Sequence, residues 1–224
     1  MTSSRKVQER AIVFPSGDLT LEGLYIKGVR GPGVVVGAPH PLYGGSMHAP
    51  ACMEIAYSAA RVGFPALRFN YRGVGGSQGE RRPVSVGPIE PASVAAFAGE
   101  SADYEAAMEE LCLTAEEDVL VAAGYSFGAA MALEVALRSE RVGAVLLASP
   151  PTRLFSFDAI PELRVPVLVV GGEGDEYLDW DLLDGLAARA PRARVERVPE
   201  AEHFWQRGLG ALGTVCRDWL QRLL

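Results

Sequence analysis

The segment GYSFG at residues 124–128 places a serine between two glycines, where an apolar run meets a helix-forming stretch. A serine hydroxyl becomes a nucleophile when an imidazole takes its proton and a carboxylate orients and stabilises that imidazole. A tight turn between a strand and a helix would present Ser126 above the edge of a sheet. The alternative is that Ser126 is only a small residue that allows close helix packing. The chemical interpretation therefore requires a histidine and an acid elsewhere in the chain.

His203 is the only histidine C-terminal to Ser126, and it lies in the segment PEAEHFW after the last predicted strand. Among the acidic residues between these two, only those of GGEGDE directly follow an apolar run, VPVLVV. We choose Asp175 as the acid, and the spacing leaves Glu173 open. The structural alternatives are a turn cap for His203 and a helix N-terminal acid for Asp175. The sequence thus predicts Ser126, Asp175 and His203 as catalytic residues.

Acyl transfer also needs two N–H donors for the oxyanion, one of which usually follows the nucleophile. Phe127 supplies that donor by position. The segment PHPLYGGSM follows an apolar run, and we expect the N–H of Leu42 to be the second donor, with Tyr43 one position further on. Pro41 has no N–H to give. We interpret His40 as a structural hydrogen-bonding group that shapes this loop, rather than as a second base.

The elements that must position these residues follow a regular order. Two β-rich segments separated by Gly17 and Asp18 predict an antiparallel hairpin. Further strands are predicted at 33–38, 66–71, 118–124, 143–149, 166–171 and 193–198. Helices are predicted at about 50–62, 101–115, 127–140, 179–190 and 209–223. The alternation predicts an α/β fold, a mostly parallel sheet in a three-layer sandwich formed by one domain over residues 1–224.

One stretch departs from this order, the irregular insertion at about 76–100, which is rich in Gly, Pro, Ser and Ala. Its run VAAFAG is more apolar than a free loop should be, so we expect residues 80–100 to form a mobile flap over the site. The alternative is an added turn of helix before Ser101, which we expect to cap the following helix. The preceding segment RGVGGSQG lacks the G-K-[ST] ending of a phosphate loop, and we interpret it as a turn.

Composition limits the partners. The net charge is −7 without a basic cluster, which argues against nucleic acid. No apolar run reaches the roughly 18 residues of a membrane helix, and the first ten residues lack the apolar core of a signal peptide. The three cysteines and three histidines form neither a disulfide framework nor a metal-ligand motif. We therefore expect a cytoplasmic protein with no membrane partner, no metal and no other cofactor, and assign Cys52 and His48 to packing or solvent.

Five motifs in order resemble the α/β-hydrolase superfamily, in particular its small lidless bacterial members. They are HPLYGG at 40–45, LRFNYRGVGGSQG at 67–79, GYSFG at 124–128, VPVLVVGGEGDE at 165–176 and EHFW at 202–205. The resemblance implies an eight-stranded, mostly parallel sheet whose second strand is antiparallel. It also implies a triad of Ser126, Asp175 and His203. The short segment between the strands at 143–149 and 166–171 leaves no room for a helical lid.

The function predicted from these residues is a serine hydrolase, a carboxylesterase that acts on small-acyl esters through an acyl-enzyme on Ser126. A thioesterase or a peptidase/amidase would use the same residues. A non-catalytic ligand-binding protein of this fold is the alternative from another class. Phe204 and Trp205 either line the acyl pocket or pack against the last helix. The expected partner is a small-molecule ester, and the sequence indicates no oligomeric state.

Overall fold

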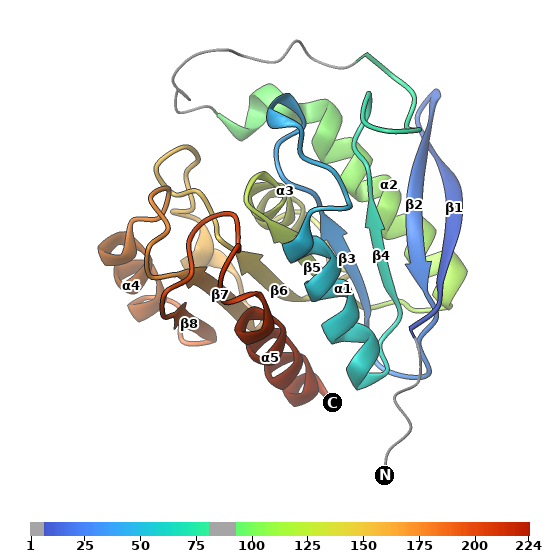
Figure 1. Cartoon of the computed structure of the whole chain (residues 1–224). Coiled ribbons are helices and arrows are strands. Elements are labelled where there is room, and N and C mark those ends of the chain that lie inside the picture. The colour runs from blue at the N-terminus through green and yellow to red at the C-terminus, as the bar shows by residue number, and fades with distance from the viewer. Residues whose placement is uncertain (1–6, 81–92) are drawn as a thin grey trace.

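The computed structural model describes residues 7–80 and 93–224 (Figure 1). Its centre is one eight-stranded sheet with the order β1-β2-β4-β3-β5-β6-β7-β8. The strands are β1 (Glu9–Ser16), β2 (Leu19–Ile26), β3 (Gly33–Gly37), β4 (Ala66–Phe69), β5 (Leu120–Tyr125), β6 (Val142–Ala148), β7 (Val167–Gly172) and β8 (Ala193–Val198). β2 pairs antiparallel with β1 and with β4, and the other neighbours are parallel. The predicted hairpin and antiparallel second strand are confirmed.

Helices cover both faces of this sheet (Figure 1). α1 (Pro50–Val62) and α5 (Leu209–Leu220) pack together on one face, and α2 (Ala98–Ala115), α3 (Phe127–Ala136) and α4 (Trp180–Ala188) cover the other. Every residue of β3, β4, β5 and β7 is buried, as expected for strands covered on both sides. Each face has its own hydrophobic core. The predicted three-layer α/β fold is confirmed.

The connection from β6 to β7 is short, as the sequence predicted. It contains only the 3₁₀ turn Ile160–Glu162, whose Ile160 is buried in the core on the α4 side. The carboxyl end of the sheet is therefore not covered by a lid domain in this part of the chain.

The start of α2 corrects the predicted insertion. A 3₁₀ turn at Val94–Phe97, capped by the Ser93 hydroxyl, runs directly into α2 at Ala98, so residues 94–100 are helical rather than irregular, in agreement with the alternative of an added turn of helix before Ser101. Ser101 is not the helix cap. It is buried within the helix and its Oγ accepts a hydrogen bond from Arg138. The helix begins a turn early because Phe97 is buried in the core, which fixes the preceding turn. The rest of the expected flap, residues 81–92, lies outside the described residues.

The glycine-rich segment after β4 is a turn, as predicted. The N–H of Gly73 donates to the carbonyl of Gln78, and the N–H of Gly76 donates 2.7 Å to the carboxylate of Glu22 on β2. The glycines therefore surround a carboxylate of the protein itself. α3 also ends earlier than expected, at Ala136 instead of residue 140, because the chain turns at Ser139 to enter β6.

Candidate active site

Ser126 lies in a sharp turn between β5 and α3, with a φ of 55°. Left-handed backbone is unfavourable for a residue other than glycine and is typical of a residue held in place by its surroundings. The flanking glycines allow this turn to exist. A Cβ on Gly124 would collide with the carbonyl of Gly128, and a Cβ on Gly128 would collide with the carbonyl of Gly37 on β3. The two glycines of GYSFG are thus required by the close approach of α3 to the sheet.

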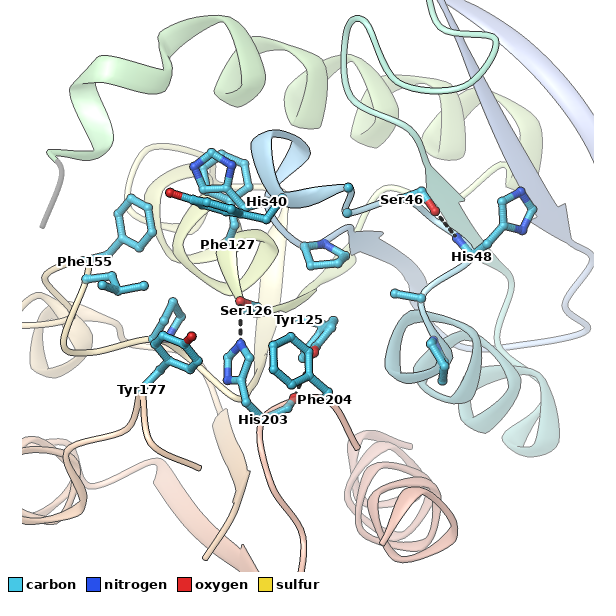
Figure 2. Close-up of a pocket in the computed structure, with 18 of the residues that line it drawn as sticks. His40, Ser46, His48, Tyr125, Ser126, Phe127, Phe155, Tyr177, His203 and Phe204 are labelled. Carbon is cyan, nitrogen blue, oxygen red and sulfur yellow. Dashed lines mark hydrogen bonds between the residues drawn. The ribbon is translucent and has the colours of Figure 1, made fainter. Parts of the chain in front are cut away.

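His203 and Asp175 follow the carboxyl ends of two other parallel strands, β8 and β7. Figure 2 shows the ring of His203 pointing at Ser126. The Oγ of Ser126 lies 3.0 Å from the Nε2 of His203. The Nδ1 of the same ring lies 2.9 Å from both carboxylate oxygens of Asp175. The structure therefore brings all three predicted residues into one continuous hydrogen-bonded chain. Glu173 is exposed, so the geometry favours Asp175 over this alternative.

The burial of Asp175 and His203 favours a fixed orientation for the imidazole. Asp175 is 4% exposed and His203 is 7% exposed. The Oδ1 of Asp175 also accepts a 3.0 Å hydrogen bond from the N–H of Tyr177, which fixes the rotation of the carboxylate. Because Nδ1 faces a carboxylate, it carries the proton, and the lone pair of Nε2 points at the serine hydroxyl.

The loop that carries His203 is held by hydrogen bonds to the end of β5 and by hydrogen bonds within the loop. The hydroxyl of Tyr125, the residue before Ser126, donates 2.8 Å to the backbone carbonyl of His203. Burial raises the pKa of Tyr125, so this phenol stays protonated and remains a donor. The carboxylate of Glu202 accepts the N–H groups of Phe204 and Gln206 at 2.9 and 2.6 Å. The sequence analysis missed this role of Tyr125, although its place beside Ser126 was a signal.

The two expected oxyanion donors differ in whether their N–H groups already have an acceptor. Phe127 is the first residue of α3, so its N–H has no acceptor within the helix. Leu42 differs from the expectation: its N–H donates to the Nδ1 of His40 at 3.1 Å, and Leu42 is not among the described residues that line the cavity. The reason is the 3₁₀ turn at Pro41–Tyr43, which the side chain of His40 caps. The interpretation of His40 as a structural group that shapes this loop therefore agrees with the structure.

A cavity of about 630 Å³ opens at Ser126. Several of its lining residues were not predicted from the sequence. They are Pro39, Gly44, Gly45, Ser46, Ala49, Pro50, Pro151, Leu154, Phe155, Tyr177 and Gln206. Phe204 is exposed and lines the cavity, whereas Trp205 is buried in the core beside α5. Of the two roles that the sequence left open, Phe204 thus lines the pocket and Trp205 packs near the last helix. His48 also lines the cavity, and Cys52 is buried in α1.

Over residues 7–80 and 93–224, no group of three or more His, Cys, Asp or Glu side chains is placed to hold a metal ion. No helix in the same ranges has the length and apolar character needed to cross a membrane.

The sequence of this chain is similar to a family of known proteins and to a bacterial relative. The sequence model of a family described as alpha/beta hydrolase fold matches residues 40–159, more than half of the chain. An uncharacterized protein of Rickettsia prowazekii is 26% identical over 93% of this chain and 87% of its own length.

Two solved structures are similar over nearly the whole chain. One, described as a serine hydrolase without a lid from Xanthomonas campestris, is 25% identical with a TM-score of 0.78, covering 97% of this chain and 95% of its own. The other, an alpha-beta serine hydrolase homologue from Coxiella burnetii, is 24% identical with a TM-score of 0.76, covering 96% of this chain and 97% of its own.

Proposed function

The chain belongs to the α/β hydrolase fold family, as its motifs indicated, and we propose that it is a serine carboxylesterase that forms an acyl-enzyme on Ser126. The observation that carries this proposal is the continuous chain from the hydroxyl of Ser126 through His203 to Asp175, with distances of 3.0 and 2.9 Å. The proposal is supported by the similarity to a structure from Xanthomonas campestris that is described as a serine hydrolase.

In the first half of the reaction, the Oγ of Ser126 attacks the ester carbonyl as its proton moves to the Nε2 of His203. The imidazolium that forms is stabilised by the buried carboxylate of Asp175, which remains ionised. The proton then passes from Nε2 to the departing alkoxide, and the acyl group remains on Ser126. Water attacks this acyl-enzyme in the second half, with His203 again acting as the base, and the acid is released.

The oxyanion of each tetrahedral intermediate needs N–H donors. We assign one of them to Phe127, whose N–H belongs to the free N-terminus of α3. A helix N-terminus also favours negative charge. Leu42 can provide the second donor only if its N–H leaves the Nδ1 of His40, so in this proposal the turn at Pro41–Tyr43 adjusts when substrate binds.

A fluorophosphonate probe tests the nucleophile without knowledge of the substrate. It should label one residue, Ser126, and the variant Ser126→Ala should lose both labelling and hydrolysis of p-nitrophenyl acetate, with kcat lower by about 10³- to 10⁶-fold. The matched control is Ser139→Ala, which removes a hydroxyl beyond the opposite end of α3; the probe should label Ser126 of this variant as it does in the native protein. If native protein is not labelled, or if Ser126→Ala retains a tenth of the activity, the proposal is wrong.

The alternative activities are separated by a substrate panel. Ester, thioester and anilide analogues with the same acyl group differ only in the leaving group. We expect the ester to give the highest kcat/KM. A protein that is labelled by the probe but prefers the thioester or anilide would be a serine hydrolase of another kind. A protein that binds esters without labelling or turnover would be a binding protein of this fold.

A further inference from the structure

The cavity extends to both sides of Ser126 and His203, and its two sides differ chemically (Figure 2). Phe155 and Tyr177 lie on one side of this pair, and Ser46 and His48 lie on the other, toward which Tyr125 and Phe204 also lie. An ester bound with its carbonyl carbon at the Oγ of Ser126 has two groups to place, the acyl chain and the alcohol. The two sides of the cavity therefore present different surfaces to these two groups.

The first side is a rigid aromatic wall. Phe155 is 5% exposed, and its ring packs edge-on against the rings of Phe97 and Phe127, each 5.8 Å away between centroids. Tyr177 lies 4.6 Å from the ring of His203 and is only partly buried, so it borders the open part of the cavity. Aromatic surfaces fixed in this way favour a flat ring, which can stack or pack edge-on without loss of much entropy.

The loop on the opposite side is held in place at Met47, the residue between Ser46 and His48 in the sequence. The backbone N–H of Met47 donates 2.8 Å to the Oδ1 of Asn70, and its carbonyl accepts 2.7 Å from the guanidinium of Arg68. Arg68 is 1% exposed and is paired with Glu9 of β1. A loop held at both backbone groups by buried side chains cannot easily withdraw, so the shape of this side is set by the loop as it stands; His48 is exposed, so this side opens to solvent.

Charge is the third observation. None of the described residues that line the cavity is Asp, Glu, Lys or Arg. A carboxylate or ammonium group on the substrate would lose water on entering the cavity and find no permanently charged partner among the described walls, whose basic side chains are His40, His48 and His203. Desolvation of an unpaired charge is unfavourable, so the bound part of the substrate is uncharged.

We propose that the substrate is an uncharged ester with an aromatic ring on one side of the scissile bond, bound against Phe155 and Tyr177, and its other group on the side of Ser46 and His48. This inference rests on the proposed function, since it names the substrate class of the same site. It specifies the shape and charge of the substrate, and the tests below distinguish whether the ring is carried by the acyl group or by the alcohol.

Matched esters test the ring. Methyl phenylacetate is compared with methyl cyclohexylacetate for the acyl group, and benzyl acetate with cyclohexylmethyl acetate for the alcohol, so that a planar ring is exchanged for a puckered one of similar size. We expect a preference for the aromatic member of about 3- to 10-fold in kcat/KM in at least one pair. Equal rates in both pairs, or a preference for cyclohexyl, would overturn the inference.

A second comparison tests charge. A 4-carboxylate on the ring of the preferred aromatic ester is compared with the 4-carboxamide, which has nearly the same shape and no charge. We expect kcat/KM of the carboxylate to be lower by at least about 10-fold. Equal rates would show that the walls tolerate a charge and would overturn this part of the proposal.

Variants locate the ring. Phe155→Leu should bring the aromatic preference close to one, whereas Phe157→Leu removes a ring that is equally buried but does not line this cavity, and should leave the preference unchanged. Tyr177→Ala, at a partly exposed position, gives a second measurement if Phe155→Leu does not fold. A preference that survives in both Phe155→Leu and Tyr177→Ala overturns the inference.

The fluorophosphonate probe keeps this proposal distinct from the proposed function. Labelling of Ser126 together with no aromatic preference would overturn the substrate class and leave the serine hydrolase intact. A protein that is not labelled would overturn the proposed function, and the substrate class with it.

Discussion

Replacing Asp175 by asparagine should lower kcat by about 10³- to 10⁴-fold, equivalent to about 4–5.5 kcal/mol of transition-state stabilisation, while the protein stays folded. The exchange keeps the size of the side chain and removes its charge. The contribution that it removes is specific to the reaction, because a neutral imidazole in the resting enzyme needs the carboxylate less than the imidazolium of the transition state does.

The magnitude follows from the contacts of the carboxylate. The Oδ1 atom accepts the N–H of Tyr177, so in the variant the amide oxygen should keep this place. The amide NH₂ then takes the position of Oδ2, which lies 2.9 Å from the Nδ1 of His203. Nδ1 then faces a donor and an acceptor, the amide NH₂ and the amide oxygen, each 2.9 Å away. The donor favours the tautomer with the proton on Nε2, and a ring in that state cannot accept the proton of Ser126. The variant therefore loses the stabilising charge and populates the wrong tautomer, as in the triad enzyme in which this exchange costs about 10⁴-fold.

Steady-state hydrolysis of p-nitrophenyl acetate by Asp175→Asn and Glu173→Gln, side by side, measures the effect. Glu173 is exposed, and its exchange should change kcat by less than about threefold. Thermal unfolding of both variants checks that the fold is kept. If Glu173→Gln loses more activity than Asp175→Asn, the acid is Glu173 and the reasoning from hydrogen-bond geometry is refuted.

Three further predictions concern residues around the site. Tyr125→Phe removes the hydroxyl that donates to the carbonyl of His203, and should lower kcat by about 3- to 10-fold with little change in KM, as expected for one buried hydrogen bond. If the free energy of unfolding in urea falls by as much as the activation free energy rises, the role of this hydroxyl is only structural. Arg68→Met leaves the carbonyl of Met47 without its donor and loosens this loop, so KM for esters with a bulky second group should fall relative to KM for methyl esters, in a kinetic comparison of the two; a uniform change would contradict the fixed wall. Burial raises the pKa of Cys52 to about 12, so its thiolate is scarce below that pH, and a thiol reagent at pH 8 should leave ester hydrolysis intact; rapid inactivation through Cys52 would contradict this.

The fold was predictable because its main signals are local. Continuous apolar runs identify strands that are buried on both faces, and the turn at Gly17 and Asp18 identifies the hairpin. The start of α2 was not predictable in this way. Ser101 has the residue type of a helix cap, but the burial of Phe97 in the core sets the helix start, and this contact depends on residues far away in the sequence.

The Ser–His–Asp arrangement could be predicted for a different reason. In a parallel sheet, the loops after the strands meet at one edge, so a serine, an acid and a histidine that each follow a strand are brought together by topology alone. The walls of the cavity do not follow from topology. Phe155 lies after β6 at the same edge, but it is the packing of its ring against Phe97 and Phe127 that fixes its place at the site.

The turn after β3 shows how two reasonable assignments can compete. His40 was interpreted as the group that shapes the loop, and Leu42 as an oxyanion donor, and each is plausible alone. The structure joins the two residues by one hydrogen bond: the N–H of Leu42 donates to the Nδ1 of His40, and the proposed oxyanion contact needs this same N–H. An uncharged imidazole is a weaker acceptor than a developing oxyanion. In the proposed mechanism, exchange of one acceptor for the other would favour the transition state over the resting enzyme, which is the differential binding that catalysis requires.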